Sequence, residues 1–377
     1  MDFLEKLKLL FKKPRVVIVV VGSGRSCTQE AISQVLKKEL QKGLQRRLRP
    51  SVLRKPEVFI LESDLKDKKE IEKLKILIGK SPLSIFVVTH LGEIPFDRDY
   101  FAADKEKTKE IEKFAKTLPF SILLILNFDD ETVREITDVT NLKTLTFGFQ
   151  EGAEFQASDI NINGWDASSA RETGEPVLGT NFKINFKGNI VPVWLEGLFG
   201  KEQIYSALAA ACVGKVLDLN LVELSQALKD YRSLPGKMQL VKGIKNSRIL
   251  DDSEGASVFS MIEAIEILGK IQGFKRKVAV LGDIIGVGKY TIEAHEAIGE
   301  KVERNAELLF VFGPRARFIA EAAKNKGMSL DKIFQFDTIN DGKLKLSEEI
   351  KEGDLILVDG STEMKMGEIV KEITERR

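Results

Sequence analysis

The chain has 377 residues, which is enough for two or three domains with sizeable cores. Its 58 Lys and Arg residues balance 57 Asp and Glu residues, so no basic excess indicates a nucleic-acid surface. The two cysteines, Cys27 and Cys212, form no disulfide framework, and no apolar run is long enough to span a bilayer. These features exclude the nucleic-acid, disulfide-rich and membrane classes and predict a cytoplasmic protein.

Residues 1–15 predict a basic amphipathic helix. Phe3, Leu4, Leu7 and Leu10 share one helical face, and lysines lie on the opposite face. A helix docked on the following domain is favoured over contact with a membrane surface, because the segment is short and leads directly into a core strand.

Apolar runs of strand length at 16–21, 57–63, 84–90 and 121–127 alternate with helical patterns. Strands buried on both faces and separated by helices predict a parallel sheet in an α/β fold. Residues 143–196 differ, because apolar positions alternate on both sides of a Lys-Gly-Asn turn. This segment predicts a small antiparallel appendage with a hairpin.

A helical stretch then ends at Pro235-Gly236, which predicts a boundary between a central domain of phosphate-loop type, 16–234, and a second domain, 235–377. The second domain repeats the pattern, with strand-length runs at 277–283, 307–313, 332–337 and 354–360. It predicts a Rossmann-like α/β domain, and the cleft between the two domains is the expected ligand site.

The segment VGSGRSCT, residues 21–28, lies between the first predicted strand and a helix. Glycine loops in this position bind phosphate, because their backbone N–H groups and the helix N-terminus favour an anion. The spacing of Gly22, Gly24, Arg25 and Ser26 departs from G-x-x-x-x-G-K-[ST], so a plain turn is an equal alternative. Glu62, which ends the next strand, favours a nucleotide site, since its carboxylate could reach a loop-bound magnesium ion; a solvated glutamate is the other interpretation.

The order of motifs resembles the central and C-terminal domains of the Mur ligase family, most closely the MurF branch, which joins D-alanyl-D-alanine to a UDP-muramoyl tripeptide. The resemblance is carried by GSGRSCT, LILNFDDETVRE, LPGKMQ, AVLGDIIGVGKYTIEAHEAIGE and DLILVDGSTEMKMGEIV. It implies ATP-dependent amide formation through an acyl phosphate, with ATP and Mg²⁺. The implied partners are a UDP-linked or other carboxylate substrate and an amino acid or dipeptide.

The resemblance also assigns roles to residues of this chain. Gly22, Ser23, Gly24 and Cys27 would surround the phosphates, Arg25 would replace the family's lysine, and Ser26 and Glu62 would bind Mg²⁺. Further nucleotide contacts would come from Lys237, Asp252 and Asp283. Lys109, or alternatively Lys107, would be the catalytic lysine that is carbamylated in several branches; both are equally well explained as surface lysines.

Several positions depart from the family pattern. In GKEQIYSA, Glu202, Gln203 and Ser206 replace His, Asn and Asn, and His90 occupies an asparagine position. Asp359 replaces the lysine of the KGSR motif, which converts a cationic acceptor pocket into one that repels a carboxylate. The UDP-binding domain is expected to be missing, or to be supplied by a partner protein. Three hypotheses follow: a ligase with an altered substrate, an inactive binding or scaffold protein, and a regulator that binds ATP without turnover.

Overall fold

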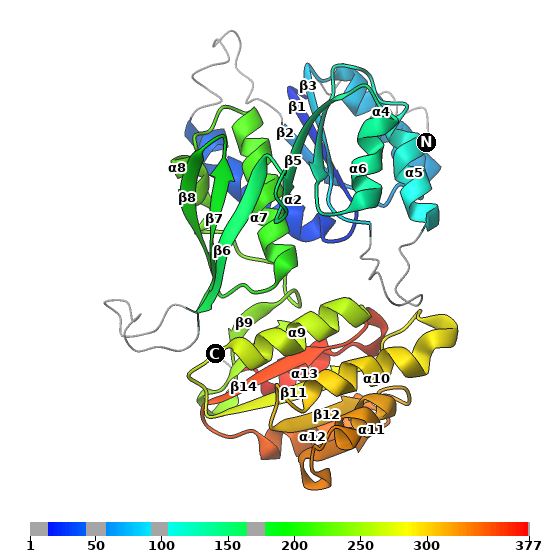
Figure 1. The fold of residues 1–377 in the computed structure, drawn as a ribbon, viewed down its shortest axis with the longest axis vertical. Helices are drawn as coiled ribbons and strands as arrows, with labels where there is room; N and C mark the ends of the chain where they lie inside the picture. Colours follow the sequence, from blue (N-terminus) through cyan, green and yellow to red (C-terminus); the bar gives the residue numbers. More distant parts are fainter. Residues whose placement is uncertain (1–13, 43–57, 92–104, 164–177, 376–377) are drawn as a thin grey trace.

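The protein folds into two lobes, each built around its own sheet (Figure 1). The computed structural model describes residues 14–42, 58–91, 105–163 and 178–375. The amphipathic helix predicted for residues 1–15 therefore lies almost wholly outside the described residues. Within the described ranges, no helix is long and apolar enough to cross a membrane.

The first lobe contains an eight-stranded sheet in the order β2-β1-β3-β4-β5-β6-β7-β8. Pairing is parallel from β2 to β6 and antiparallel from β6 to β8. The strands are β1 (Val16–Val21), β2 (Val58–Glu62), β3 (Leu83–Val88), β4 (Leu123–Asn127), β5 (Lys143–Gly148), β6 (Phe155–Asn163), β7 (Gly179–Phe186) and β8 (Asn189–Glu196).

Helices cover both faces of this sheet, as the continuous apolar strands predict. Val16, Ile18 and Val20 of β1 pack with α2 (Arg25–Lys42), α7 (Lys201–Val216) and α8 (Leu221–Leu228). Val17 and Val19 face the opposite side, toward α4 (Lys68–Lys80), α5 (Lys105–Ala115) and α6 (Glu131–Asp138). The alternation along one strand therefore separates two cores.

The segment 143–196 differs in part from the sequence prediction. The hairpin is confirmed: β7 and β8 pair across Lys187 and Gly188, whose φ values of +48° and +77° suit a tight two-residue turn. Strand β5, however, pairs in parallel with β4, and β6 pairs in parallel with β5. The antiparallel strands thus extend the main sheet, because α7 covers the apolar face that runs from β4 to β6.

The second lobe contains a six-stranded sheet in the order β13-β12-β11-β14-β10-β9, parallel except for β9. Its strands are β9 (Gln239–Lys242), β10 (Arg248–Asp252), β11 (Arg276–Gly282), β12 (Leu308–Phe312), β13 (Ile333–Phe336) and β14 (Asp354–Asp359). One face packs against α9 (Val258–Lys270), α10 (Thr291–Val302) and α11 (Arg317–Asn325), and the other against α12 (Ile339–Glu349) and α13 (Gly367–Ile373). The Rossmann-like arrangement agrees with the sequence prediction.

Candidate functional site

The glycine loop joins β1 to α2 at the carboxyl edge of the first sheet. Gly22 and Gly24 have φ values of +103° and +71°, a region that favours glycine. A Cβ atom on Gly22 would lie 2.9 Å from the carbonyl oxygen of His90. The sequence therefore needs glycine here, because the loop passes directly against the end of β3.

The loop is held to that neighbouring strand end by hydrogen bonds. Ser23 donates its backbone N–H to the carbonyl oxygen of His90 at 2.7 Å. The Thr89 hydroxyl donates to the carbonyl oxygens of Val21, at 3.0 Å, and Ser23. The N–H of Ser23 is consequently already paired and would have to leave His90 before it could bind a phosphate.

The N-terminus of α2 carries the remaining donors. Thr28 donates its N–H to Gly24 at 3.0 Å, so the N–H groups of Arg25, Ser26 and Cys27 form the open first turn. Such a turn favours an anion, because its donors and the helix dipole act together. This half of the loop has the form of a phosphate site.

Three predicted residues meet beside that turn. The Ser26 hydroxyl donates to Glu62 Oε2, and Arg25 Nε lies 4.0 Å from the same oxygen. Arg25 Nη1 also donates to the Gly22 carbonyl oxygen at 3.4 Å. Strand β2 pairs with β1 so that Val20 lies opposite Glu62, which brings the carboxylate to the loop. The fold therefore brings Ser26 and Glu62 together, and their binding of Mg²⁺ stays a prediction.

The donor set also suits magnesium. A hydroxyl and a carboxylate oxygen are hard ligands, and Mg²⁺ typically takes one or two carboxylates together with substrate phosphates and waters. The described residues contain no group of three or more His, Cys, Asp or Glu side chains that could hold a metal ion alone. Ser26 and Glu62 would thus bind Mg²⁺ only together with a phosphate ligand.

Cys27 points away from this turn into the protein. It is 1% exposed, and its Sγ lies 3.5 Å from Ser233 Oγ. Burial and the nearby Glu202 carboxylate raise the pKa of Cys27 to about 12, so the thiol stays neutral. Only its backbone N–H remains available to a nucleotide.

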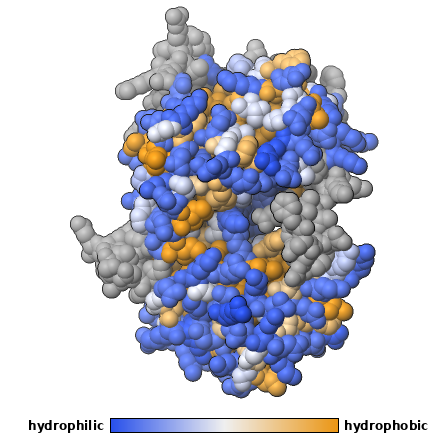
Figure 2. All heavy atoms as spheres, viewed as in Figure 1, coloured by the Kyte–Doolittle hydropathy of each residue, from blue (hydrophilic) through white to orange (hydrophobic). Residues whose placement is uncertain are grey.

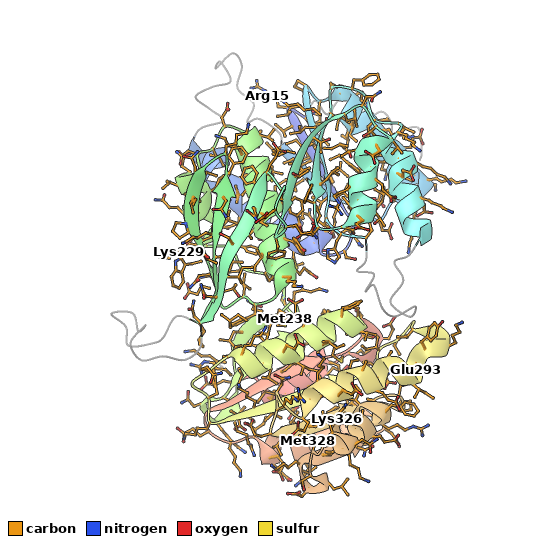
Figure 3. All side chains as sticks on the ribbon, viewed as in Figure 1. Arg15, Lys229, Met238, Glu293, Lys326 and Met328 are labelled. Atoms are coloured by element: carbon orange, nitrogen blue, oxygen red, sulfur yellow. The ribbon has the colours of Figure 1, made fainter. Side chains whose placement is uncertain are left out.

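A cavity of about 530 Å³ lies between the two lobes. It is lined from the first lobe by Ser23, Gly24, His90, Glu202 and Tyr205, and from the second by Lys237, Asp252, Phe259, Ile284 and Val287. In the space-filling view, apolar residues gather where the lobes meet, and Met238, another lining residue, is labelled at this junction (Figures 2 and 3). Ser23 and Gly24 of the loop therefore share one cleft with Lys237 and Asp252. The other predicted residues of the loop region do not line it: Gly22, Arg25, Ser26, Cys27 and Glu62.

Lys237 and Asp252 belong to the first part of the second lobe along the chain: Lys237 precedes β9, and Asp252 ends β10. Lys237 Nζ donates to the carbonyl oxygen of Glu254, and Asp252 Oδ1 accepts the N–H of Met238 at 3.0 Å. Burial, and next the charge of Glu202, raise the pKa of Asp252 to about 7. A carboxylate with this pKa changes charge near neutral pH.

Two other predicted residues do not line the cavity. Asp283 is 1% exposed and accepts the backbone N–H groups of Arg315, at 3.0 Å, and Ala316, at 2.6 Å. These bonds favour a structural role within the second lobe. Lys109 is an exposed residue of α5, and the Lys107 side chain lies outside the described residues. The nucleotide role of Asp283 and the catalytic role of Lys109 remain predictions without support from this arrangement.

His90 and Glu202 belong to the site although the sequence showed them only as departures from a family pattern. Both line the cavity, and His90 Nδ1 and Glu202 Oε1 are buried without a hydrogen-bond partner. The signal in the sequence is positional: His90 follows β3, and Glu202 is the second residue of α7. Strand ends and helix starts of this kind surround ligands in open α/β sheets.

Comparison with known proteins shows what the chain resembles. Residues 236–362 match the glutamate ligase domain of Mur ligases. The chain is 25% identical to the UDP-N-acetylmuramoyl-tripeptide–D-alanyl-D-alanine ligase of Bacillus subtilis over 382 aligned residues, covering 96% of this chain and 76% of that protein.

Solved structures show the same fold. A MurF structure from Acinetobacter baumannii superposes with a TM-score of 0.72 at 18% identity, covering 98% of this chain and 78% of that one. MurF from Thermotoga maritima in complex with ADP gives 0.71 at 20% identity, with coverages of 98% and 81%. Residues 236–362 therefore form a Mur ligase glutamate ligase domain, and the chain as a whole has the fold of the MurF structures and resembles the Mur ligases in sequence.

Proposed function

We propose that this protein is an ATP-dependent carboxylate–amine ligase of Mur type that acts on a peptidoglycan precursor. The observation that carries the proposal is the meeting of Ser26 and Glu62 beside the open first turn of α2. The named activity of the Bacillus subtilis relative, which aligns over 96% of this chain, supports the same reaction.

The chain's own residues would act mainly by positioning. The first-turn N–H groups of α2 and the Arg25 guanidinium would hold the terminal phosphates, and Ser26 and Glu62 would hold Mg²⁺. Bound Mg²⁺ would neutralise charge that develops on the transferred phosphoryl group. In balance, the substrate carboxylate displaces ADP to give an acyl phosphate, and the amine then displaces phosphate and releases a proton.

The first test is calorimetric titration of Mg-ATP into the protein and into Arg25→Ala and Glu62→Ala. We expect saturable binding that each substitution weakens by about tenfold or more, because each removes a charged ligand worth about 1.5–3 kcal/mol. Arg317→Ala and Glu293→Ala change exposed residues outside both the glycine loop and the cavity and should leave binding unchanged. Release of ADP with a UDP-linked tripeptide and an amine acceptor, either D-alanyl-D-alanine or a diamine, would then establish the ligase.

A second candidate is a Mur-shaped binding protein that does not turn over ATP. Two observations favour it: the Ser23 N–H is bonded to His90, and the Glu202 side chain packs against Gly24, where its carboxylate would repel a phosphate. No binding heat and no thermal shift with millimolar Mg-ATP would exclude the ligase and leave this candidate.

A further inference from the structure

Two carboxylates face the cleft from opposite lobes. Glu202 comes from α7, and Asp252 ends β10; both line the cavity. Glu202 Oε1 is buried and has no hydrogen-bond partner. Gln203, next to Glu202, donates its Nε2 to the Lys237 carbonyl oxygen at 3.0 Å, and Met238 donates its N–H to Asp252 at 3.0 Å, so the two carboxylates belong to one neighbourhood.

A third carboxyl group lies behind this pair. Strand β14 pairs in parallel with β10 so that Asp359 lies opposite Asp252, and paired residues project to the same face. Asp359 is 0% exposed, and neither of its oxygens has a hydrogen-bond partner. Burial, and next the charge of Asp252, raise the pKa of Asp359 well above its usual range, so this group stays protonated and the uncompensated charge belongs to Glu202 and Asp252.

The lysines around the site do not neutralise these carboxylates. Burial raises the pKa values of Asp252 and Asp359, and the charge of Lys237 offsets this only in part, while its ammonium donates to the Glu254 carbonyl oxygen. Lys201 is exposed, and its backbone N–H is bonded to Glu263, a further acid that lines the cavity. The balance of charge at the cleft stays negative.

Three kinds of ligand could pair with these oxygens. A metal ion is disfavoured, because the described residues contain no cluster of three metal-ligating side chains. A neutral N–H donor would satisfy the hydrogen bonds but would leave the charges uncompensated. An ammonium group offers three donors and a positive charge together.

We propose that the cleft binds an organic ammonium group between Glu202 and Asp252, so that the amine substrate is cationic at the end that enters this site. The role as amine substrate rests on the proposed ligase function; the binding site itself does not. Phe259, Ile284 and Val287 line the same cavity and suit the alkyl chain of a diamine. A substrate with a free carboxylate at that end would be repelled.

The test is calorimetric titration without nucleotide at about pH 8, where Asp252 is ionised, using 1,4-diaminobutane, 4-aminobutanoate and D-alanyl-D-alanine as probes. We expect saturable binding of the diamine and much weaker binding of the two carboxylate-bearing probes. Glu202→Gln and Asp252→Asn should each weaken diamine binding by about tenfold or more, because each removes a charged hydrogen bond. Glu293→Gln, on the exposed face of α10, is the matched control and should change nothing.

Circular dichroism and thermal melting would confirm that both variants fold. Absence of saturable diamine binding, binding by both variants as tight as by the parent protein, or displacement of the diamine by MgCl₂ alone would each overturn the ammonium site. Because no ATP is present, this result is separate from the ligase test. Diamine binding without ATP turnover would support the ammonium site and reject the ligase. Ligation of D-alanyl-D-alanine with no diamine binding would support the ligase and reject the ammonium site.

Discussion

At the scale of single residues, Asp252 makes stability depend on pH. Its pKa is about 7 in the folded protein, raised from 3.8 first by burial and then by Glu202. The folded state therefore holds the proton more tightly than the unfolded state, and stability falls as pH rises between these two values. Above about pH 7 the full cost of the buried charge is present.

Asp252→Asn should remove this cost while it keeps an oxygen that can accept the Met238 N–H. We expect the variant to gain stability over the parent protein at about pH 8 and to gain little at about pH 4. Urea unfolding at the two pH values measures the difference. Asp337→Asn, on an exposed position, is the control; an equal gain by Asp252→Asn at both pH values would contradict the assigned cause.

Gly22 gives a second prediction at this scale. Gly22→Ala would place Cβ against the carbonyl oxygen of His90 in a backbone with φ of +103°, at a cost of about 1–3 kcal/mol. We expect lower stability and loss of Mg-ATP binding. Gly79→Ala is the opposite control: nothing lies within 4 Å of its Cβ, and alanine in α4 should add about 0.5–1 kcal/mol. Unchanged ATP affinity in Gly22→Ala would show that the loop does not hold the nucleotide.

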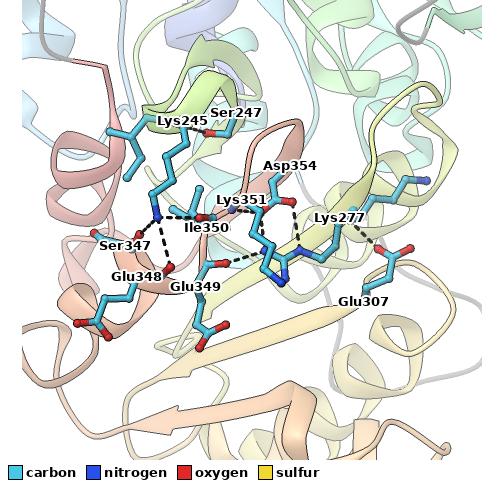
Figure 4. A network of polar contacts seen from close by, with 12 residues as sticks. Lys245, Ser247, Lys277, Glu307, Ser347, Glu348, Glu349, Ile350, Lys351 and Asp354 are labelled. Carbon is cyan, nitrogen blue, oxygen red and sulfur yellow. Dashed lines mark hydrogen bonds and ion pairs between the residues drawn. The ribbon is translucent and has the colours of Figure 1, made fainter.

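At the scale of elements, Lys245 stabilises the end of α12. Its ammonium donates to the carbonyl oxygens of Ser347, at 2.9 Å, Glu348, at 3.3 Å, and Ile350, at 2.8 Å (Figure 4). A cation at a helix C-terminus satisfies orphan carbonyls and opposes the helix dipole. The contact also joins β9 and β10 to α12 across more than a hundred residues of sequence.

Lys245→Met should cost about 1–2 kcal/mol, because it leaves these carbonyl groups without their donor. Thermal unfolding measures the loss, and amide hydrogen exchange should increase mainly in the last turn of α12. Lys332→Met, which changes an exposed lysine outside this cap, should have little effect. Unaltered exchange in α12 would mean that the cap contributes nothing.

Most elements could be predicted from sequence, because fully buried parallel strands read as unbroken apolar runs. Val16–Val21 and Leu123–Asn127 are examples. The pairing of strand β5 could not be predicted, because polar and apolar residues alternate along Lys143–Gly148. The strand continues the parallel sheet because α7 packs on its face. Local pattern therefore identifies a strand but does not determine its partner.

The candidate site was predictable where it depends on strand ends and loops. Ser26 and Glu62 were placed together because adjacent parallel strands end at one edge. The sequence predicted an acidic pocket only from Asp359, and it did not predict the pair formed by Glu202 and Asp252, because these two are 50 residues apart, on different lobes. Their proximity exists only once the two lobes are joined.

At the scale of the whole molecule, backbone pairing between residues 197–199 and 238–240 helps to join the two lobes. Phe199 donates its N–H to Met238 at 3.3 Å, and Leu240 donates to Gly197 at 2.9 Å. Phe199 precedes α7 of the first lobe but packs, fully buried, in the core that surrounds α9 and α10. The segment before α7 thus packs into the core of the second lobe, and this packing fixes the position of Glu202 relative to Asp252.

Phe199→Ala should therefore destabilise the second lobe although the residue precedes a helix of the first. A buried phenylalanine is worth about 3–5 kcal/mol on truncation to alanine. We expect hydrogen exchange to increase in β10 and β11 and to change much less in β1 and β3. Phe182→Ala, in the first core and 1% exposed, should show the reverse pattern. If both variants loosened the two sheets equally, the lobes would unfold as one unit, and the cleft would be the inside of a single domain rather than a joint between two.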